Sequence, residues 1–478
     1  MLFNSINFAI FLPIVFLLYW FVTKNNLKFQ NILLLVASYY FYACWDFRFL
    51  FLLIFSTLLD YYSGIKIENS SSEKNRKFWF WLSIGINLGF LGVFKYYNFF
   101  VDSIKDVVFL FGHKIDLWTI KVILPVGISF YTFHGLSYVI DIYKKRIPVE
   151  TNFINYATFV CYFPLLVAGP IERATHLLPQ IKKKRTFNYA QAVDGLRQIL
   201  WGLFKKIVIA DNCAEYANLI FNNSDDYSGS TLIMGALFFT FQIYGDFSGY
   251  SDIALGTSRL FGMELLKNFN FPYFSRDIAE FWRRWHISLS SWFKDYLYIP
   301  LGGSVGGLKL KIRNTFIIFL VSGFWHGANW TFIVWGALNA LYFLPLLLSN
   351  TNRNYMKIVA YDSNLPSFKE LVSIIITFSL TVFAWIFFRA NSLTHAITYI
   401  KDIFTSKLIA LPEVRPTFVI VLVAIFILIE WIGRRNNYAL EKMFTEKSVF
   451  VRWSFYFVLL FAIFIFSTKE QEFIYFQF

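Results

Sequence analysis

Long apolar runs separated by short polar interruptions extend along the chain from about residue 8 to residue 467. A helix needs about 20 mostly apolar residues to cross a bilayer, and about twelve runs approach that length. The pattern predicts an all-α polytopic membrane protein with about 11 to 12 transmembrane helices and no soluble domain. The expected spans are residues 6–22, 31–45, 49–65, 78–100, 121–143, 192–212, 231–247, 315–330, 331–349, 371–389, 416–433 and 453–468.

One further apolar stretch, "NYATFVCYFPLLVAGPIERATHLLPQ" at residues 155–180, is expected to enter the membrane and leave on the same side. Pro164, Gly169 and Pro179 interrupt it, and a full crossing would carry the basic run 182–185 to the outer side. Such re-entrant backbone is tolerated only where protein or a water-filled cavity covers it.

Basic residues set the expected orientation. Lys24 and Lys28 follow the first apolar run and no basic residue precedes it, so the N-terminus is expected outside. Alternation then places the acidic "NNSDDYSGS" outside and the basic stretch 267–313 inside. With twelve spans the C-terminus is expected outside as well.

Composition supports this class: 57% of the residues are hydrophobic and only 15% are charged. The net charge of +14 comes from lysines and arginines in short loops, so we expect no nucleic-acid partner. Cys44, Cys161 and Cys213 stand alone, with neither the paired spacing of a zinc site nor a disulfide framework, so we expect no metal.

One ionisable residue, His326, lies about ten residues into the apolar stretch "FIIFLVSGFWHGANWTFIVWGALNA" at residues 316–340. A histidine at that depth marks a functional site by default, although it can also simply bridge helices by hydrogen bonds. Gly323 and Gly327 leave space for another group. Ser322 and Asn329, at i−4 and i+3, are expected on the same helix face.

A second unusual segment covers residues 270–307 and combines tryptophan with basic side chains. This composition is typical of a membrane interface, and His286 lies within it. Taken alone, His286 is expected to be structural. The residues that carry the interfacial pattern are Trp282, Arg283, Arg284, Trp285, Trp292 and Lys294.

Two carboxylates in "DFSGYSD", Asp246 and Asp252, are expected at the end of an apolar span. They could pair with Arg259 or Arg276, or shape a polar tunnel, and we favour the structural role. No serine-protease-like order, HExxH motif or nucleophile elbow is evident. Two histidines beside a guanidinium-rich segment suit a site that draws an anionic, activated donor from the cytoplasm and reacts it inside the bilayer.

Three of these segments together resemble the membrane-bound O-acyltransferase family, in particular its bacterial branch. They are "YGDFSGYSDIALG", "NFNFPYFSRDIAEFWRRWHISLSSWFKDYLYIPLGG" and "SGFWHGANWTFIVWGALNA". That branch includes the alginate O-acetyltransferase membrane subunit and the D-alanyl transfer protein of teichoic acid synthesis, and the alginate type fits better. "LVAGPIERATHLLPQ" and the first twenty residues also match, so the resemblance covers nearly the whole chain.

The resemblance implies helices ringed around a central tunnel, with a cytoplasmic funnel for an acyl thioester and a second funnel facing outward. The family's nearly invariant histidine falls on His326, the expected catalytic base, and its second polar position on His286. Asp246, Trp325 and Asn329 lie in matching motifs and are expected near the tunnel. His286, Asn329 or backbone N–H groups would stabilise the oxyanion.

The expected activity is that of an O-acyltransferase of the acetyltransferase type. The donor is expected to be acetyl-coenzyme A, with no tightly bound cofactor and no metal. Four cations on the inner side could hold its phosphates, although the positive-inside bias explains them equally well. They are Arg283, Arg284, Lys309 and Lys311.

The chain ends on "FIYFQF" at residues 473–478. A one-span accessory protein of the D-alanine transfer system ends in a similar motif, whose tyrosine is implied to carry the acyl group. We therefore expect a membrane domain at residues 1–447 and a fused one-span unit at residues 448–478. Tyr475 would be the acyl carrier, because a phenol pKa of about 10 lies near a thiol pKa of about 8.5. Alternatively, Tyr475 is an interfacial anchor.

The resulting hypothesis is a multi-pass protein of the bacterial cytoplasmic membrane that passes acetyl groups outward. The expected partners are surrounding lipid, an extracytoplasmic acetyltransferase of the SGNH type and, indirectly, a polysaccharide such as alginate or peptidoglycan. The alternatives are a non-catalytic scaffold and a transporter component of a polysaccharide system. A transporter predicts broken helices in paired repeats, and no repeat is visible in the sequence.

Overall fold

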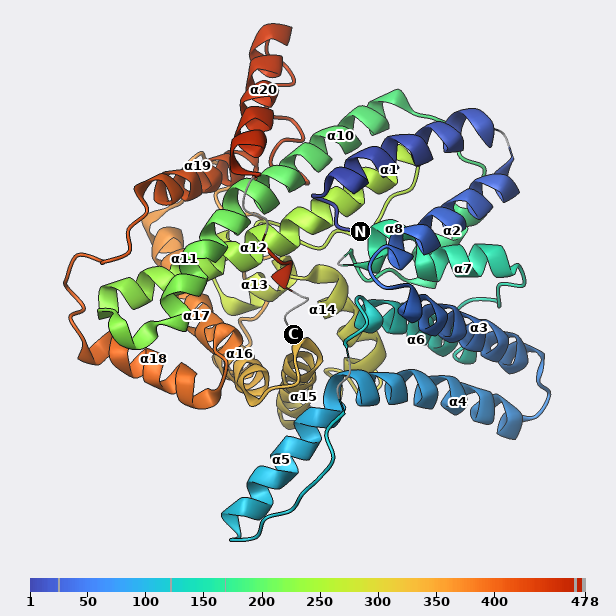
Figure 1. Ribbon diagram of the computed structural model, residues 1–478, viewed down its shortest axis with the longest axis horizontal. Coiled ribbons are helices and arrows are strands. Elements are labelled where there is room, and N and C mark those ends of the chain that lie inside the picture. The colour runs from blue at the N-terminus through green and yellow to red at the C-terminus, as the bar shows by residue number, and fades with distance from the viewer. Residues whose placement is uncertain (25, 121–122, 168, 468–470, 475–478) are drawn as a thin grey trace. The chain divides into compact units, whose positions relative to one another are not determined.

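The structure is a computed structural model that describes residues 1–24, 26–120, 123–167, 169–467 and 471–474. It is 71% helical, and the described residues contain no strand. The backbone divides into two compact units, residues 1–192 with 258–266 and residues 193–257 with 267–478. Figure 1 follows the helices from the N-terminus in blue to α20 in red. An all-α fold is therefore confirmed.

Several helices are long and apolar enough to cross a membrane, as the sequence predicted. By length and composition they are α3, α4 with its continuation α5, α16, α17 and α20. Two shorter helical stretches, Ile6–Val22 and Thr417–Gly433, are also apolar. The number of spans, the central tunnel and the expected boundary between residues 447 and 448 stay predictions.

In the first unit α3, α4 and α6 pack on one another, and α2 packs on α7. Its expected re-entrant stretch is broken into the short helices α7, α8 and α9, and α8 has Pro164 in its first turn. The helices are α1 (Ile6–Leu17), η1 (Leu18–Val22), α2 (Leu27–Ala43), α3 (Phe47–Asn69), α4 (Glu73–Leu91), η2 (Gly92–Tyr96), α5 (Tyr97–Leu110), α6 (Ile128–Tyr143), α7 (Phe153–Cys161), α8 (Phe163–Leu166) and α9 (Ala174–Lys182).

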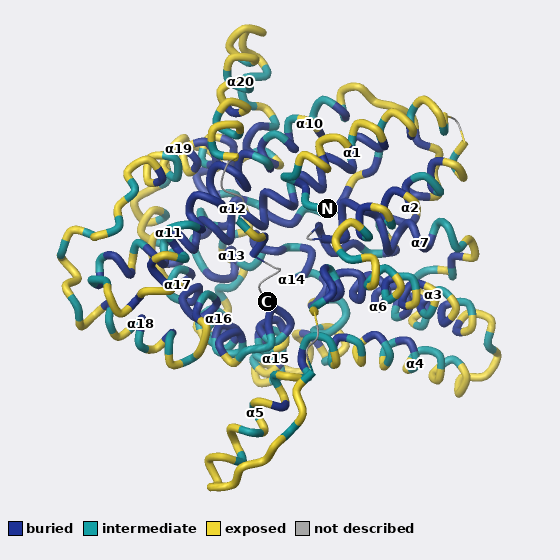
Figure 2. Tube along the Cα trace, viewed as in Figure 1, coloured by how far each residue is buried: buried dark blue, intermediate teal, exposed yellow. Residues whose placement is uncertain are grey.

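The second unit contains the candidate chemistry, and Figure 2 shows α12 and α13 among its most deeply buried elements. Its helices are α10 (Tyr189–Leu203), η3 (Phe204–Ala210), α11 (Asp211–Asn222), η4 (Ser224–Asp226), α12 (Gly229–Leu260), η5 (Pro272–Phe274), α13 (Ile278–Arg284), α14 (Ile287–Phe293), η6 (Lys294–Tyr298), α15 (Leu308–His326), α16 (Trp330–Leu348), α17 (Phe368–Arg389), α18 (Leu393–Thr405), α19 (Thr417–Gly433) and α20 (Val449–Phe466).

Glycines set two close helix crossings in this unit. A Cβ on Gly249 of α12 would lie 2.8 Å from the carbonyl oxygen of Gly202 on α10. A Cβ on Gly323 of α15 would lie 2.2 Å from the carbonyl oxygen of Phe332 on α16. Small residues at helix contacts are the usual packing device in membranes, and these two contacts fix the helices that carry the site.

One expectation about these elements was wrong. The "DFSGYSD" segment lies well inside the 32-residue helix α12 and not at the end of a span, because the helix continues to Leu260. In the segment expected at a membrane interface, Trp285 is 1% and Trp292 is 7% exposed, and Trp282 is partly buried. Trp285 stacks on Phe281 with a centroid distance of 5.5 Å, so an aromatic core accounts for the same composition.

Candidate active site

His326 is the last residue of α15 and is 3% exposed. The helix ends there because Gly327 adopts an extended conformation. Three rings surround the imidazole: its centroid lies 4.9 Å from Trp325, 5.1 Å from Trp335 and 5.3 Å from Phe388. The imidazole therefore lies in an aromatic cage built by α15, α16 and α17.

Asn329 does not share a helix face with His326, contrary to the sequence expectation. The chain breaks at Gly327, and Asn329 caps the next helix by accepting the N–H of Thr331 at 3.0 Å. Its amide nitrogen donates to the carbonyl oxygen of Asn391 at 3.0 Å. Both ends of the Asn329 side chain are thus engaged in holding the turn after His326.

His286 is buried within the protein and has a strained backbone. It is 1% exposed and begins α14 with φ of 41°, a left-handed conformation that is uncommon for a residue other than glycine. Its Nδ1 lies 2.9 Å from Asn268 Oδ1, which also accepts the hydroxyl of Ser288 at 2.9 Å. Strain of this kind persists where the surroundings impose it and is frequent at active sites.

The hydrogen bonds of Asn268 assign the tautomer of His286. Because Asn268 Oδ1 is an acceptor, Nδ1 of the neutral imidazole carries the proton, and Nε2 is left as an acceptor. Nε2 is buried and has no hydrogen-bond partner among the residues that the structure describes. A buried acceptor without a partner is available to a substrate.

The fold brings the two histidines together from segments 40 residues apart. Their ring centroids are 6.4 Å apart, and Trp325 contacts both, lying 5.9 Å from His286. On the other side, Phe247 of α12 meets His286 edge to face at 4.6 Å. Two buried imidazoles among aromatic rings can move a proton and hold a reacting group.

Asp246 lies next to Phe247 and forms a buried charge cluster. Its carboxylate lies 2.7 Å from Lys206 Nζ, and the same ammonium donates to Asp211 at 2.8 Å. This corrects the expected partners, because Arg276 pairs with Glu280 and Glu370. Sequence reasoning missed Lys206, although two adjacent lysines inside an expected span were a visible signal.

The last described residues of the chain contact this cluster. Ile474 donates its backbone N–H to Asp246 Oδ2 at 2.7 Å, and Lys206 Nζ donates to the carbonyl oxygen of Gln471 at 3.2 Å. Phe473 and Ile474 are both 0% exposed. Tyr475, the expected acyl carrier, lies outside the described residues.

Arg283 and Arg284 are engaged within the fold. Arg283 donates to the carbonyl oxygens of Asn352 and Tyr355, each at 2.9 Å. Arg284 pairs with Glu280 at 2.8 Å. Both guanidinium groups therefore brace the protein.

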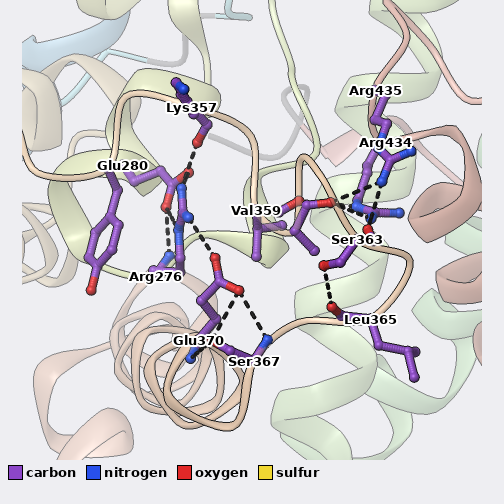
Figure 3. Close-up of polar contacts among 12 residues, drawn as sticks. Arg276, Glu280, Lys357, Val359, Ser363, Leu365, Ser367, Glu370, Arg434 and Arg435 are labelled. Carbon is purple, nitrogen blue, oxygen red and sulfur yellow. Dashed lines mark hydrogen bonds and ion pairs between the residues drawn. The ribbon is translucent and has the colours of Figure 1, made fainter.

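The loop between α16 and α17 is held by arginines from several elements, as Figure 3 shows for part of it. Arg276 lies between Glu280 and Glu370 and donates to the carbonyl oxygen of Lys357 at 2.5 Å. Arg434 donates to the carbonyl oxygen of Ser363 at 2.8 Å. These contacts fix the loop that carries Asn352 and Arg353.

A pocket of about 580 Å³ opens beside this loop. Its rim carries Lys294, Lys311 and Arg353, and its apolar wall includes Phe319 and Phe343. Lys309, the other lysine expected to bind the donor, is exposed and does not line it. A cationic rim above an apolar wall suits a ligand with phosphates at one end and an uncharged arm at the other.

Aromatic contacts connect the pocket wall to the histidines. Phe319 meets Trp282 at 5.2 Å, Trp282 meets Trp335 at 5.7 Å, and Trp335 contacts His326. The indole N–H of Trp282 donates to Asn339 at 3.2 Å, which fixes the ring. The pocket therefore lies within three ring contacts of His326.

A second, polar pocket of about 760 Å³ lies next to the turn that Asn329 holds. Asp225, Asp226, Asn391 and His395 are among the residues that line it. Burial and the nearby charge of Arg389 lower the pKa of His395. No group of three or more potential metal ligands occurs in the part of the chain that the structure describes.

Known proteins resemble this chain over the segments that build the candidate site. A family model described as MBOAT, membrane-bound O-acyltransferase family, matches residues 144–387. The chain is 41% identical over 395 residues to "Probable alginate O-acetylase AlgI" of Pseudomonas putida, covering 82% of this chain and 78% of that protein. It is 37% identical over 432 residues to "Peptidoglycan O-acetyltransferase" of Helicobacter pylori, covering 84% and 79%.

A more distant similarity is to "Teichoic acid D-alanyltransferase" of Bacillus subtilis, with 28% identity over 288 residues. It covers 56% of this chain and 70% of that protein. The alginate-type similarity is therefore both higher and longer than the D-alanyl one, as the sequence motifs predicted.

Proposed function

The chain belongs to the membrane-bound O-acyltransferase family, and from this premise we propose that it takes an acetyl group from a cytoplasmic thioester and passes it outward for O-acetylation of a cell-surface polysaccharide. The main observation behind this proposal is that His286 and His326 are both buried where several helices meet, with their ring centroids 6.4 Å apart. The family and the alginate- and peptidoglycan-modifying relatives support the reaction type.

We assign the donor, acetyl-coenzyme A, to the 580 Å³ pocket. Lys294, Lys311 and Arg353 would bind its phosphates, and the apolar wall would accept the thioester arm. The assignment is supported by the basic loops, which predict that this region faces the cytoplasm. Arg283 acts through the loop that it braces, so its part in donor binding is positioning.

In the proposed transfer, His326 is the base and the acceptor is a hydroxyl, which we assign to Tyr475. The hydroxyl proton moves to His326 as the oxygen bonds to the thioester carbonyl carbon. The carbon–sulfur bond then breaks, and the protonated imidazole returns the proton to the leaving thiolate. The products are an acetyl-tyrosine ester and a free thiol.

His286 has a different part in this proposal from the one its sequence suggested. Because Nδ1 donates to Asn268, Nε2 accepts a hydrogen bond from the substrate and does not donate one to an oxyanion. Asn329 is occupied by Thr331 and Asn391. We therefore assign His286 to substrate orientation and Asn329 to holding the turn after His326.

An aryl ester on the outer side would be a suitable donor for a partner. A phenol pKa of about 10 makes the ester more activated than a sugar ester, so passing the acetyl group onward is downhill. We assign the next step to an extracytoplasmic acetyltransferase of the SGNH type, acting on a polysaccharide such as alginate or peptidoglycan. The location is the bacterial cytoplasmic membrane.

The test is His326→Ala in cells that carry the polysaccharide. We expect polysaccharide acetylation to fall by about 10² to 10⁴-fold, the range for loss of a general base, at normal membrane abundance. Wild-type acetylation by this variant would refute the assignment and leave the scaffold alternative. Tyr475→Phe should also abolish acetylation, with acetyl on Tyr475 detected by peptide mass spectrometry only when His326 is present.

A further inference from the structure

The chain after α20 returns to the interior of the second unit, where its last described residues are held by side chains. Ile474 donates its N–H to Asp246 at 2.7 Å, and Gln471 accepts from Lys206 at 3.2 Å. Phe473 packs its ring on Tyr250 with a centroid distance of 4.1 Å. Residues 471–474 therefore occupy a binding site made by α12 and η3.

The charges of that site lie far from either end of a long helix. Lys206 belongs to η3, which joins α10 to α11 in a continuous helical run over residues 189–222, about 50 Å long. The side chains of Lys206 and Asp246 are 1% and 2% exposed. Ionisable groups at such depth are costly and mark functional sites, and single π-helical turns like η3 are frequent at such sites.

The bound segment explains why charged groups are present there. Residues 471–473 have no helical or strand hydrogen bonding of their own. Backbone groups inside a membrane domain must be satisfied within the protein. Asp246 accepts the N–H of Ile474 on one oxygen and meets Lys206 with the other, so one carboxylate joins the ion pair to the tail.

The residue that follows Asp246 contacts the histidine pair. Asp246 is followed directly by Phe247, whose ring meets that of His286 at 4.6 Å. His286 in turn lies 6.4 Å from His326. The residue next in sequence after Ile474 is Tyr475.

We propose that Asp246 and Lys206 are positioning residues that bind residues 471–474 and so present the end of the chain to the histidine pair. The presentation of the chain end to the histidines rests on the proposed carrier role of Tyr475, whereas the binding of residues 471–474 does not. Loss of the contact should release the tail without removing either histidine.

The first test measures release of the tail in the purified full-length protein. Carboxypeptidase trimming is followed by intact mass, with loss of Ile474 and Phe473 as the readout. Asp246→Leu should raise the trimming rate roughly tenfold or more, since the tail loses a hydrogen bond to a charged group. Asp246→Asn keeps an acceptor oxygen and should raise it only a few-fold.

Asp252 provides a matched control on the same helix. Its carboxylate pairs with Lys205 at 2.5 Å, six residues from Asp246, and no described contact joins it to the tail. The tail of the Asp252→Leu variant should therefore be trimmed at the wild-type rate. Equal trimming of Asp246→Leu and wild type, in monodisperse protein, would overturn the proposal.

A second variant leaves the buried ion pair untouched. Ile474→Pro removes the N–H donor, whereas Ile474→Ala keeps it. We expect acetyl-Tyr475 to fall at least tenfold in the proline variant and to fall less in the alanine variant, which keeps the N–H but loses a buried side chain. Wild-type acetylation in Ile474→Pro would contradict the positioning role even if Asp246→Leu failed to fold.

The two proposals fail in different ways. If Tyr475→Phe keeps normal polysaccharide acetylation, the carrier role is wrong, while faster trimming of Asp246→Leu would still support the binding site. If Tyr475→Phe abolishes transfer but Asp246→Leu is trimmed like wild type, the carrier stands and the positioning residues are wrong.

Discussion

Lys309 and Lys311 lie two positions apart on α15, yet only Lys311 lines the 580 Å³ pocket. Lys309 is exposed. Comparing variants of the two lysines therefore tests whether a cation that lines the pocket matters more than a cation elsewhere in the same basic segment. Both lysines carry the same positive-inside signal, so sequence alone could not distinguish them.

Replacing Lys311 with alanine should weaken donor binding. We expect the KM for the acetyl donor to rise about 5- to 20-fold with kcat changed less than about twofold, because a charge-assisted contact to a phosphate is worth about 1.5 to 3 kcal/mol when buried and less at a rim. Lys309→Ala is the control and should leave both constants near wild type. Equal KM values for the two variants would place the donor elsewhere.

Single residues also show why some site predictions could be made and others could not. The depth of His326 in an apolar run is visible in the sequence, so it could be singled out. The burial of His286 could not, because tryptophan and arginine side by side are equally typical of an interface and of an aromatic core braced by arginines. Lys206 was missed because its partner Asp246 lies 40 residues away on another helix.

At the scale of helices, the crossing of α10 and α12 holds Lys206 and Asp246 in place. Gly249 faces the backbone of Gly202, and Gly256 faces that of Gly195, where a Cβ would lie 2.4 Å from the carbonyl oxygen. Apolar run lengths predicted these helices. They did not predict the crossing, because tertiary packing decides which helix lies against Gly249 and Gly256.

Gly249→Ala tests this crossing. A Cβ 2.8 Å from the carbonyl oxygen of Gly202 forces the helices apart, and overpacking of this kind costs about 1 to 3 kcal/mol. We expect lower thermal stability in detergent and faster carboxypeptidase trimming of the tail. Gly85→Ala on α4, where nothing lies within 4 Å, should be neutral or slightly stabilising. Equal stability of the two variants would contradict the close crossing.

On the scale of the whole chain, α20 and the tail combine a weakly packed helix with a tightly held end. Figure 2 shows α20 largely exposed, and Leu459 is the one residue of this helix that is buried. Arg197 of α10 donates to Tyr456 of α20 at 2.9 Å. Phe473 and Ile474, both 0% exposed, are thus more deeply buried than any residue of α20.

That difference in packing predicts that residues 448–478 can work as a separate chain. Splitting the chain between residues 447 and 448 and co-expressing both pieces should restore at least about a tenth of wild-type acetylation, because the tail contacts can form between two chains at the cost of association. Acetylation of the polysaccharide and co-purification of the pieces are the measurements. The piece 448–478 carrying Ile474→Pro should fail to restore activity, whereas one carrying Ile474→Ala should succeed. No activity from the wild-type pieces, despite their co-purification, would mean that the covalent connection itself is required.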